Sequence, residues 1–184
     1  MKKIGLALLA VAVLATFAFA GDDVTPKTKS GDKAWMFTYN GLTAAGVGSY
    51  NGGAGVKYYF QDNMALRFGV SFSSSSVSGA SNNPSSYGVT VGLEDVFSTL
   101  GSSAAYFGAQ LMYGSSKNAA TNWENASQFG IGVIAGVNWF PWNNVSLTPE
   151  YDLGFMSYGS YGNVPSSSSI GISSTGSLTI SWFF

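Results

Sequence analysis

Eight segments of this 184-residue chain alternate apolar and polar side chains with a period of two. Such alternation places successive side chains on opposite faces of a β-strand. In each segment one face carries aromatic and aliphatic residues, and the other carries chiefly Gly, Ser, Thr, Asn and Gln. We therefore expect eight strands, at Trp35–Tyr39, Ala54–Phe60, Met64–Phe72, Tyr87–Glu94, Ala105–Tyr113, Phe129–Trp139, Val145–Phe155 and Leu178–Phe184.

A sheet with one apolar face closes into a barrel with that face inside, as in soluble barrels, or outside, against lipid. The composition favours an apolar face directed outward against lipid, because only 9% of the residues are charged, against about 25% in soluble domains. The Gly, Ser and Thr of the polar face suit the narrow interior of an eight-stranded barrel. We therefore predict an all-β fold, an eight-stranded antiparallel up-and-down transmembrane β-barrel.

The connections between the predicted strands alternate in length, which is typical of outer-membrane barrels with short periplasmic turns and longer external loops. The short connections are 61–63, 98–103 and 141–144, and the long ones are 43–53, 73–86, 114–128 and 157–177. Serine runs at Ser73–Ser76 and Ser166–Ser169 are expected to be flexible external loop.

The first twenty residues have the features of a secretory signal peptide. Lys2 and Lys3 precede an apolar run, which ends at Ala18-Phe19-Ala20 before Gly21. Residues 21–33 carry six charges in thirteen positions and predict a flexible periplasmic segment. The expected organisation is therefore a cleaved signal peptide at 1–20, that segment at 21–33, and the barrel at 34–184, in the outer membrane.

Aromatic residues gather at the ends of the predicted strands, as the rings of membrane proteins do at the two interfaces. The Trp residues fall toward the short turns and the Tyr residues toward the long loops. The predicted interface aromatics are Trp35, Trp139, Trp142, Trp182, Tyr87, Tyr113 and Tyr158.

Five charged residues lie on the predicted inward face, and we expect them to form an ion network that plugs the lumen: Lys57, Arg67, Glu94, Glu150 and Asp152. Counting back from the 61–63 turn, with Phe60 paired to Met64, places Lys57 opposite Arg67. Two like charges in that position require a nearby carboxylate, which Glu94 supplies at a comparable depth. The alternative interpretation is an ion path through the barrel.

Enzymatic and cofactor functions find little support in the composition. The chain has no His and no Cys, so Ser–His and Cys–His nucleophiles and thiolate zinc sites are excluded. Glu150 and Asp152 could in principle act as an acid–base pair, but an interior salt network accounts for them more simply. We predict no catalytic, metal or cofactor site, and a formal net charge of −1 gives no basic surface for nucleic acid.

With eight strands, a signal peptide and the closing run Leu178-Thr-Ile-Ser-Trp-Phe-Phe184, the chain resembles the small OmpA/OmpX-type outer-membrane barrels of Gram-negative bacteria. The resemblance covers 34–184. It implies both termini in the periplasm and a C-terminal signal for the barrel-assembly machinery, matched here by Leu178, Ile180, Trp182 and Phe184. It implies little about activity, because a fold does not fix a function.

The leading functional expectation is a non-enzymatic, monomeric surface barrel in contact with outer-membrane lipid and lipopolysaccharide, which supports membrane integrity or surface contact and adhesion. The alternative is a narrow, porin-like channel for ions or small solutes. Candidate contacts for an unknown surface ligand are Tyr50, Trp123, Glu124 and Tyr161, which are large side chains among small polar loop residues. Pro149 lacks an N–H and predicts a bulge or a gap in its strand ladder.

Overall fold

The computed structural model describes residues 24–40, 49–75, 85–117, 125–159, 166–172 and 177–184. Within these ranges no helix has the length and hydropathy of a membrane-spanning segment. The strands are β1 (Lys33–Asn40), β2 (Ser49–Gln61), β3 (Met64–Ser75), β4 (Ser85–Leu100), β5 (Ser103–Lys117), β6 (Asn125–Trp142), β7 (Val145–Tyr158), β8 (Ser167–Ile172) and β9 (Ser177–Phe183).

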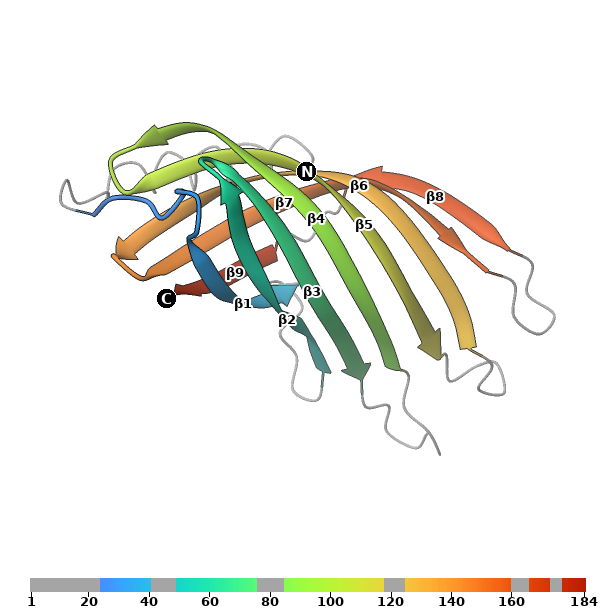
Figure 1. The fold of residues 1–184 in the computed structure, drawn as a ribbon. Coiled ribbons are helices and arrows are strands. Elements are labelled where there is room, and N and C mark those ends of the chain that lie inside the picture. Colours follow the sequence, from blue (N-terminus) through green and yellow to red (C-terminus); the bar gives the residue numbers. More distant parts are fainter. Residues whose placement is uncertain (1–23, 41–48, 76–84, 118–124, 160–165, 173–176) are drawn as a thin grey trace, which may run out of the picture.

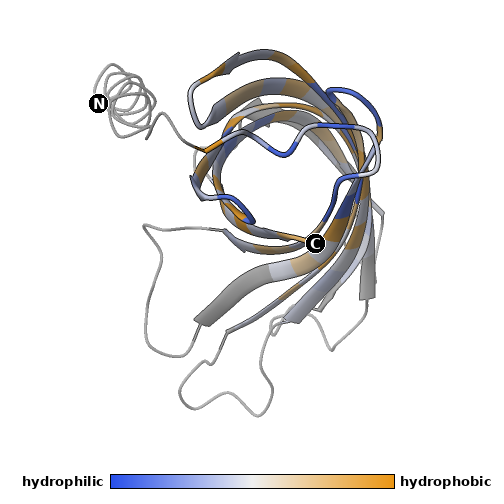
Figure 2. Ribbon diagram, turned by 60° about the vertical axis from the view of Figure 1, so that its left-hand side comes forward, coloured by the Kyte–Doolittle hydropathy of each residue, from blue (hydrophilic) through white to orange (hydrophobic). Residues whose placement is uncertain are grey.

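The strands form a closed antiparallel barrel (Figures 1 and 2). Consecutive strands pair from β1 to β7, and β9 closes the ring by pairing with both β7 and β1. β8 pairs with the Leu153–Tyr158 half of β7, and β9 pairs with its Val145–Glu150 half. β8 and β9 therefore lie along the same edge of β7 and together occupy the position of the eighth strand, and the predicted fold class is confirmed.

Two-residue turns join β2 to β3, β4 to β5, and β6 to β7, all at the end of the barrel that holds the C-terminus (left in Figure 1). Asn63 and Gly101 take positive φ angles of 67° and 53° in two of these turns, a conformation that Asn and Gly adopt most readily. The strand before each turn carries a register shift: at Tyr59/Gln61, Val96/Ser98 and Trp139/Trp142. Gln61, and not Phe60, pairs with Met64.

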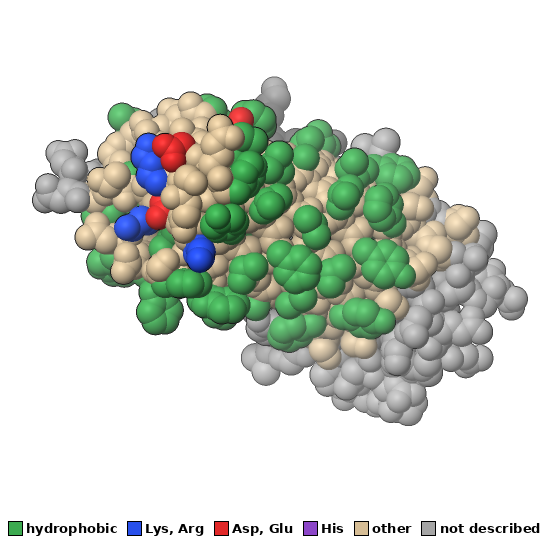
Figure 3. Space-filling view, in the orientation of Figure 1, with side chains coloured by type: hydrophobic (Ala, Val, Ile, Leu, Met, Phe, Trp, Pro, Cys, Tyr) green, Lys and Arg blue, Asp and Glu red, His purple; other side chains and the backbone are tan. Residues whose placement is uncertain are grey.

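The outward face of the barrel is apolar, as the alternation predicts. Figure 3 shows hydrophobic side chains spread over the strands, with charged side chains gathered at one end. Exposed outward residues recur along every strand from β1 to β7, and among them are Phe37, Leu66, Phe68, Val91, Leu111, Ile131 and Leu153. Val137 differs, because it is buried although it shares the predicted outward face. An exposed apolar belt on a closed barrel requires an apolar solvent, which a bilayer provides.

Two serine runs expected in loops lie partly in strands. Ser73–Ser75 end β3, and Ser167–Ser169 begin β8. The loop interpretation is wrong for these residues because the register continues through them: Ser73 pairs with Ser86, and Ser168 pairs with Ser157. The strands thus extend farther from the tight turns than the hydrophobic alternation does.

Pro149 interrupts the pairing of β6 with β7, as its missing N–H predicts. The ladder passes from the Gly136–Glu150 pair to the Trp139–Leu147 pair without a shift in register. Two pairs are therefore missing beside Pro149, which confirms a local gap. On its other side Pro149 still pairs with Leu178 of β9.

The described part of the segment that was expected to be flexible, residues 24–33, docks on the barrel through hydrogen bonds. The Gly31 amide donates to the Tyr59 carbonyl at 2.7 Å, and the Asn63 amide donates to the Thr28 carbonyl at 2.7 Å. Thr28 is buried, and Val24 packs against the buried cluster inside the barrel. The segment is held by backbone groups of Tyr59 in β2 and of Asn63 in the β2–β3 turn.

Asp62 links this docking to pH. Its carboxylate accepts a backbone hydrogen bond from the Ser30 amide at 2.9 Å and one from Lys29 Nζ at 3.2 Å, and these two contacts lower the pKa of Asp62 from its ordinary value of 3.8. Because its pKa is lower in the folded state, the Asp62 carboxyl stabilises the docked segment at pH values above its ordinary pKa. This stabilisation is lost as the pH falls through the lowered pKa.

We expect an NMR titration to place the Asp62 midpoint below pH 3.8, with the Ser30 amide shift following the same curve. In Asp62→Asn the Ser30 amide should no longer titrate with this midpoint. A midpoint at or above 3.8 in the wild-type protein would contradict the docking contacts.

Candidate functional site in the barrel lumen

The inward-facing charges lie at a middle level of the lumen. Lys57 of β2 pairs in register with Arg67 of β3, as the turn count predicts. Glu94 comes from β4, the neighbour of β3, and Glu150 comes from β7. Three adjacent strands and one distant strand therefore supply the four side chains. They are largely removed from solvent, and we refer to Lys57, Arg67, Glu94 and Glu150 as the ion cluster.

Glu94 compensates the two neighbouring cations. Its Oε2 lies 2.7 Å from Lys57 Nζ and 3.9 Å from Arg67 Nη1. Lys57 Nζ also donates to Asn138 Oδ1 at 3.2 Å and lies 5.6 Å from the centre of the Tyr106 ring. Buried charges persist only when paired and hydrogen-bonded, and Lys57 meets both conditions.

The Arg67 guanidinium makes a two-pronged contact across the lumen with Glu150. Arg67 Nη1 pairs with Glu150 Oε2, and Nη2 lies 3.4 Å from Oε1. The Tyr106 hydroxyl donates to the same Glu150 Oε2. Arg–carboxylate forks fix geometry as well as charge, so this pair ties β3 to β7 through the interior.

Neutral side chains add hydrogen bonds to the ion cluster. The Tyr59 hydroxyl donates to Glu94 Oε1 at 3.1 Å, and Asn138 Nδ2 donates to the same oxygen at 2.8 Å. The Thr148 hydroxyl donates to Asn138 Oδ1 at 2.7 Å. Tyr59, Tyr106, Asn138 and Thr148 were not among the predicted site residues. The two tyrosines stand in the sequence as aromatic exceptions on the polar face, which is the signal that could have identified them.

Asp152, the fifth predicted member, is placed apart from the ion cluster. Its carboxylate accepts a hydrogen bond from Gln110 Nε2 at 2.6 Å. Among the described side chains, no Lys or Arg nitrogen lies within ion-pair distance of it. The predicted network thus assembles as four residues, with Asp152 as a partly exposed carboxylate beyond them.

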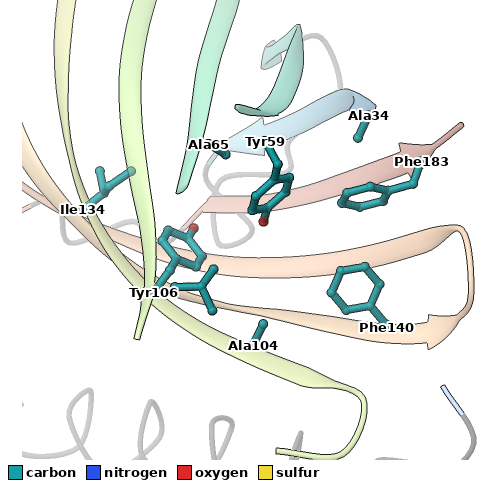
Figure 4. Close-up of a cluster of buried hydrophobic side chains, with 9 residues drawn as sticks. Ala34, Tyr59, Ala65, Ala104, Tyr106, Ile134, Phe140 and Phe183 are labelled. Atoms are coloured by element: carbon teal, nitrogen blue, oxygen red, sulfur yellow. The ribbon is translucent and has the colours of Figure 1, made fainter. Parts of the chain in front are cut away.

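A buried apolar cluster fills the lumen between the ion cluster and the tight turns (Figure 4). Phe140 and Phe183 lie with ring centres 5.3 Å apart, and the small residues Ala34, Ala65 and Ala104 belong to the same cluster. Tyr59 and Tyr106 connect the two clusters, since their rings pack in the apolar cluster while their hydroxyls donate to Glu94 and Glu150 of the ion cluster. The turn end of the barrel is therefore packed with side chains.

A cavity of about 170 Å³ lies on the other side of the ion cluster, toward the loop ends of the strands. Arg67 and Glu150 reach it from the ion cluster, and Gln110 and Asp152 also line it. Glycines and hydroxyl residues line much of the remaining wall, among them Gly53, Gly69, Thr38, Ser71 and Thr90. From the turns outward, the lumen thus holds the apolar cluster, the ion cluster and this cavity, which we call the vestibule.

The two carboxylates considered as an acid–base pair serve different partners. Glu150 is held by Arg67 and Tyr106, and Asp152 by Gln110. Within the described ranges, no group of three or more His, Cys, Asp or Glu side chains could hold a metal ion. The arrangement can neutralise charge and bind polar groups in the vestibule.

The predicted interface aromatics occupy both ends of the strands. Trp35 and Trp182 are register partners near the turn end, and both are exposed, as are Trp142, Tyr87 and Tyr113. Trp139 and Tyr158 are only partly exposed. The C-terminal residues Ile180, Trp182 and Phe184 also face outward, whereas Leu178 is partly buried. Trp123, Glu124, Tyr161 and the side chain of Tyr50 lie outside the described residues.

Closure, an apolar belt and a polar lumen define the chain as a transmembrane β-barrel. No protein-family model and no curated protein matches the sequence. Among solved structures it is similar to the outer membrane protein AlkL in lipid bilayers, with a TM-score of 0.52 and 11% identity over 87% of this chain and 93% of AlkL. This likeness shows the fold, and the predicted resemblance to small eight-stranded outer-membrane barrels is confirmed.

Two further solved structures also match. Neisserial surface protein A gives a TM-score of 0.49 and 15% identity, over 83% of this chain and 92% of that protein. The N-terminal β-barrel domain of Pseudomonas aeruginosa OprF gives a TM-score of 0.48 and 14% identity, over 84% of this chain and 98% of that domain.

Proposed function

We propose that this chain is an integral outer-membrane protein without enzymatic activity, whose lumen is closed and whose loops face the exterior. The observation that carries the proposal is the filling of the lumen at two successive levels, by the apolar cluster and by the ion cluster. Eight strands leave an interior just wide enough for side chains. A barrel of this kind supports membrane integrity or presents its loops for surface contact and adhesion.

The outward apolar belt supports contact with outer-membrane lipid and lipopolysaccharide. We further propose secretion through residues 1–20 as a signal peptide, assembly through the C-terminal strand by the barrel-assembly machinery, and a monomeric state. Tyr50, Trp123, Glu124 and Tyr161 are the residues we propose for surface contact. Their test is loss of binding to the partner when they are replaced together by Ser.

A narrow channel for ions or small solutes is the second candidate. The vestibule favours it, because a polar cavity of about 170 Å³ already occupies part of the lumen. Conduction would require a path past the Arg67–Glu150 pair and then through the apolar cluster at the turn end.

Planar-bilayer conductance of the refolded mature protein separates the two candidates. We expect no steady current steps from the wild-type protein, because a continuous water path is blocked at two levels. Arg67→Ser is the lumen variant, and Lys29→Ser is the control, since Lys29 is an exposed cation at the rim. A heat-sensitive gel shift checks that each protein is folded. Steady, salt-dependent wild-type steps that change in Arg67→Ser and not in Lys29→Ser would establish the channel instead.

A further inference from the structure

The charges of the described lumen do not balance. Lys57 and Arg67 contribute two positive charges, and Glu94, Glu150 and Asp152 contribute three negative ones. The two cations are taken up by Glu94 and Glu150. The excess negative charge therefore resides on Asp152, whose described partner is the neutral amide of Gln110.

The Asp152 carboxylate has no cationic partner among the described side chains. It belongs to the wall of a cavity that can hold a small molecule. The vestibule has a volume of about 170 Å³, and a cavity of about 150 Å³ is enough for a molecule the size of benzene. Arg67 and Glu150 mark its closed end, since the ion cluster and the apolar cluster lie beyond them. A ligand would enter from the loop side and stop at the ion cluster.

The chemistry of the wall selects the charge and size of the ligand. Thr38, Ser71 and Thr90 offer hydroxyl oxygens to a hydrogen-bond donor, while Met36 and Met112 offer thioether and methyl surface to a short apolar chain. A negative charge within low-dielectric walls attracts cations into such a recess. A single carboxylate with hydroxyls and thioethers suits an ammonium group, which needs few ligands, better than a hard metal ion, which needs about six oxygens.

We propose that the vestibule is a binding site for small primary ammonium cations, with Asp152 as the anionic partner of the ammonium group. Gln110 holds the Asp152 carboxylate through its hydrogen bond. The methionine side chains contact the alkyl portion. This inference rests on the proposed closed lumen for the retention of the ligand, because a blind recess retains a solute that an open pore would pass, and on Asp152 for its binding.

Isothermal titration of the refolded protein in a nonionic detergent with n-butylammonium tests the site, with butyrate as the anion of matched size. We expect n-butylammonium to bind and butyrate not to bind. The side-chain amide signals of Gln110 should shift during the ammonium titration, because Gln110 contacts Asp152 directly. Equal binding of butyrate, or no binding of n-butylammonium, would overturn the proposal.

Two variants assign the binding to Asp152. Asp152→Asn should weaken n-butylammonium binding at least tenfold, while Asp95→Asn, which removes the same charge outside the vestibule lining, should leave it within twofold. Met112→Lys adds a cation to the wall and should weaken binding at least tenfold even if Asp152→Asn fails to fold. Unchanged n-butylammonium binding in either Asp152→Asn or Met112→Lys would contradict the assignment of the site to the vestibule. Conductance of the wild-type protein with intact, Asp152-dependent binding would refute the closed lumen and leave the cation site standing.

Discussion

Replacing Glu94 by Gln should lower the free energy of unfolding by about 3–5 kcal/mol, the usual cost of removing one partner from a buried ion pair. Glu94 is 0% exposed, and its carboxylate is shared by Lys57 at 2.7 Å and Arg67 at 3.9 Å. Gln keeps the shape of the side chain and removes its charge. The two cations, which are register partners, would then share the lumen with Glu150 as the remaining carboxylate of the ion cluster.

Equilibrium unfolding in urea, in the same lipid vesicles for every variant, measures this loss. Asp95→Asn is the matched control, because it neutralises the next residue along β4 without touching the ion cluster, and we expect a change within about 0.5 kcal/mol. The double variant Lys57→Met/Glu94→Gln should recover part of the loss, since the buried cation leaves with its partner. If Glu94→Gln unfolds like the wild-type protein, the ion cluster does not stabilise the barrel.

The barrel and the pairing of Lys57 opposite Arg67 could be predicted from the sequence, because both depend on local rules. A period of two decides which side chains point inward, so Lys57, Arg67, Glu94, Glu150 and Asp152 could all be assigned to the lumen before any contact was known. The Lys57–Arg67 register follows from counting back from a tight turn. The assumed Phe60–Met64 pair was wrong, because Gln61 pairs with Met64. The predicted pairing of Lys57 with Arg67 is still correct, because the bulge lies between Lys57 and the turn and restores the assumed register.

Contacts across the lumen could not be predicted from alternation. Which inward residues meet depends on the stagger of the closed barrel, a property of the whole ring. Arg67 reaches Glu150 and Asp152 reaches Gln110, although alternation treats the two carboxylates as equivalent neighbours on one face. The hydrogen bonds of Asn138 to Glu94 and of Tyr106 to Glu150 are hidden from sequence for the same reason.

Phe140 lies just past the strand that the alternation predicted, which ended at Trp139. A strict period of two places Trp139 on the lipid face and, continued by one residue, places Phe140 on the inward face. The register shift between Trp139 and Trp142 lies at the end of this strand, where Phe140 is buried in the lumen beside Phe183.

Phe140→Ala should therefore destabilise the protein by about 3–5 kcal/mol, the range for truncating a buried aromatic side chain. The Phe140 side chain is 0% exposed, and its ring is 5.3 Å from that of Phe183. The loss arises because the apolar cluster is enclosed by strands, so the vacated volume stays as a cavity. Urea unfolding in lipid vesicles again provides the measurement.

Phe97→Ala is the control that separates packing inside the lumen from contact with lipid. Phe97 is 65% exposed on the outside of the barrel, and its ring centre lies 6.0 Å from that of Phe107. Lipid or solvent can occupy the space that this truncation leaves, so the loss should be distinctly smaller than for Phe140→Ala. Equal losses in the two variants would mean that the turn end of the lumen relaxes as freely as the outer surface. The apolar cluster could then not serve as the second barrier of a closed barrel.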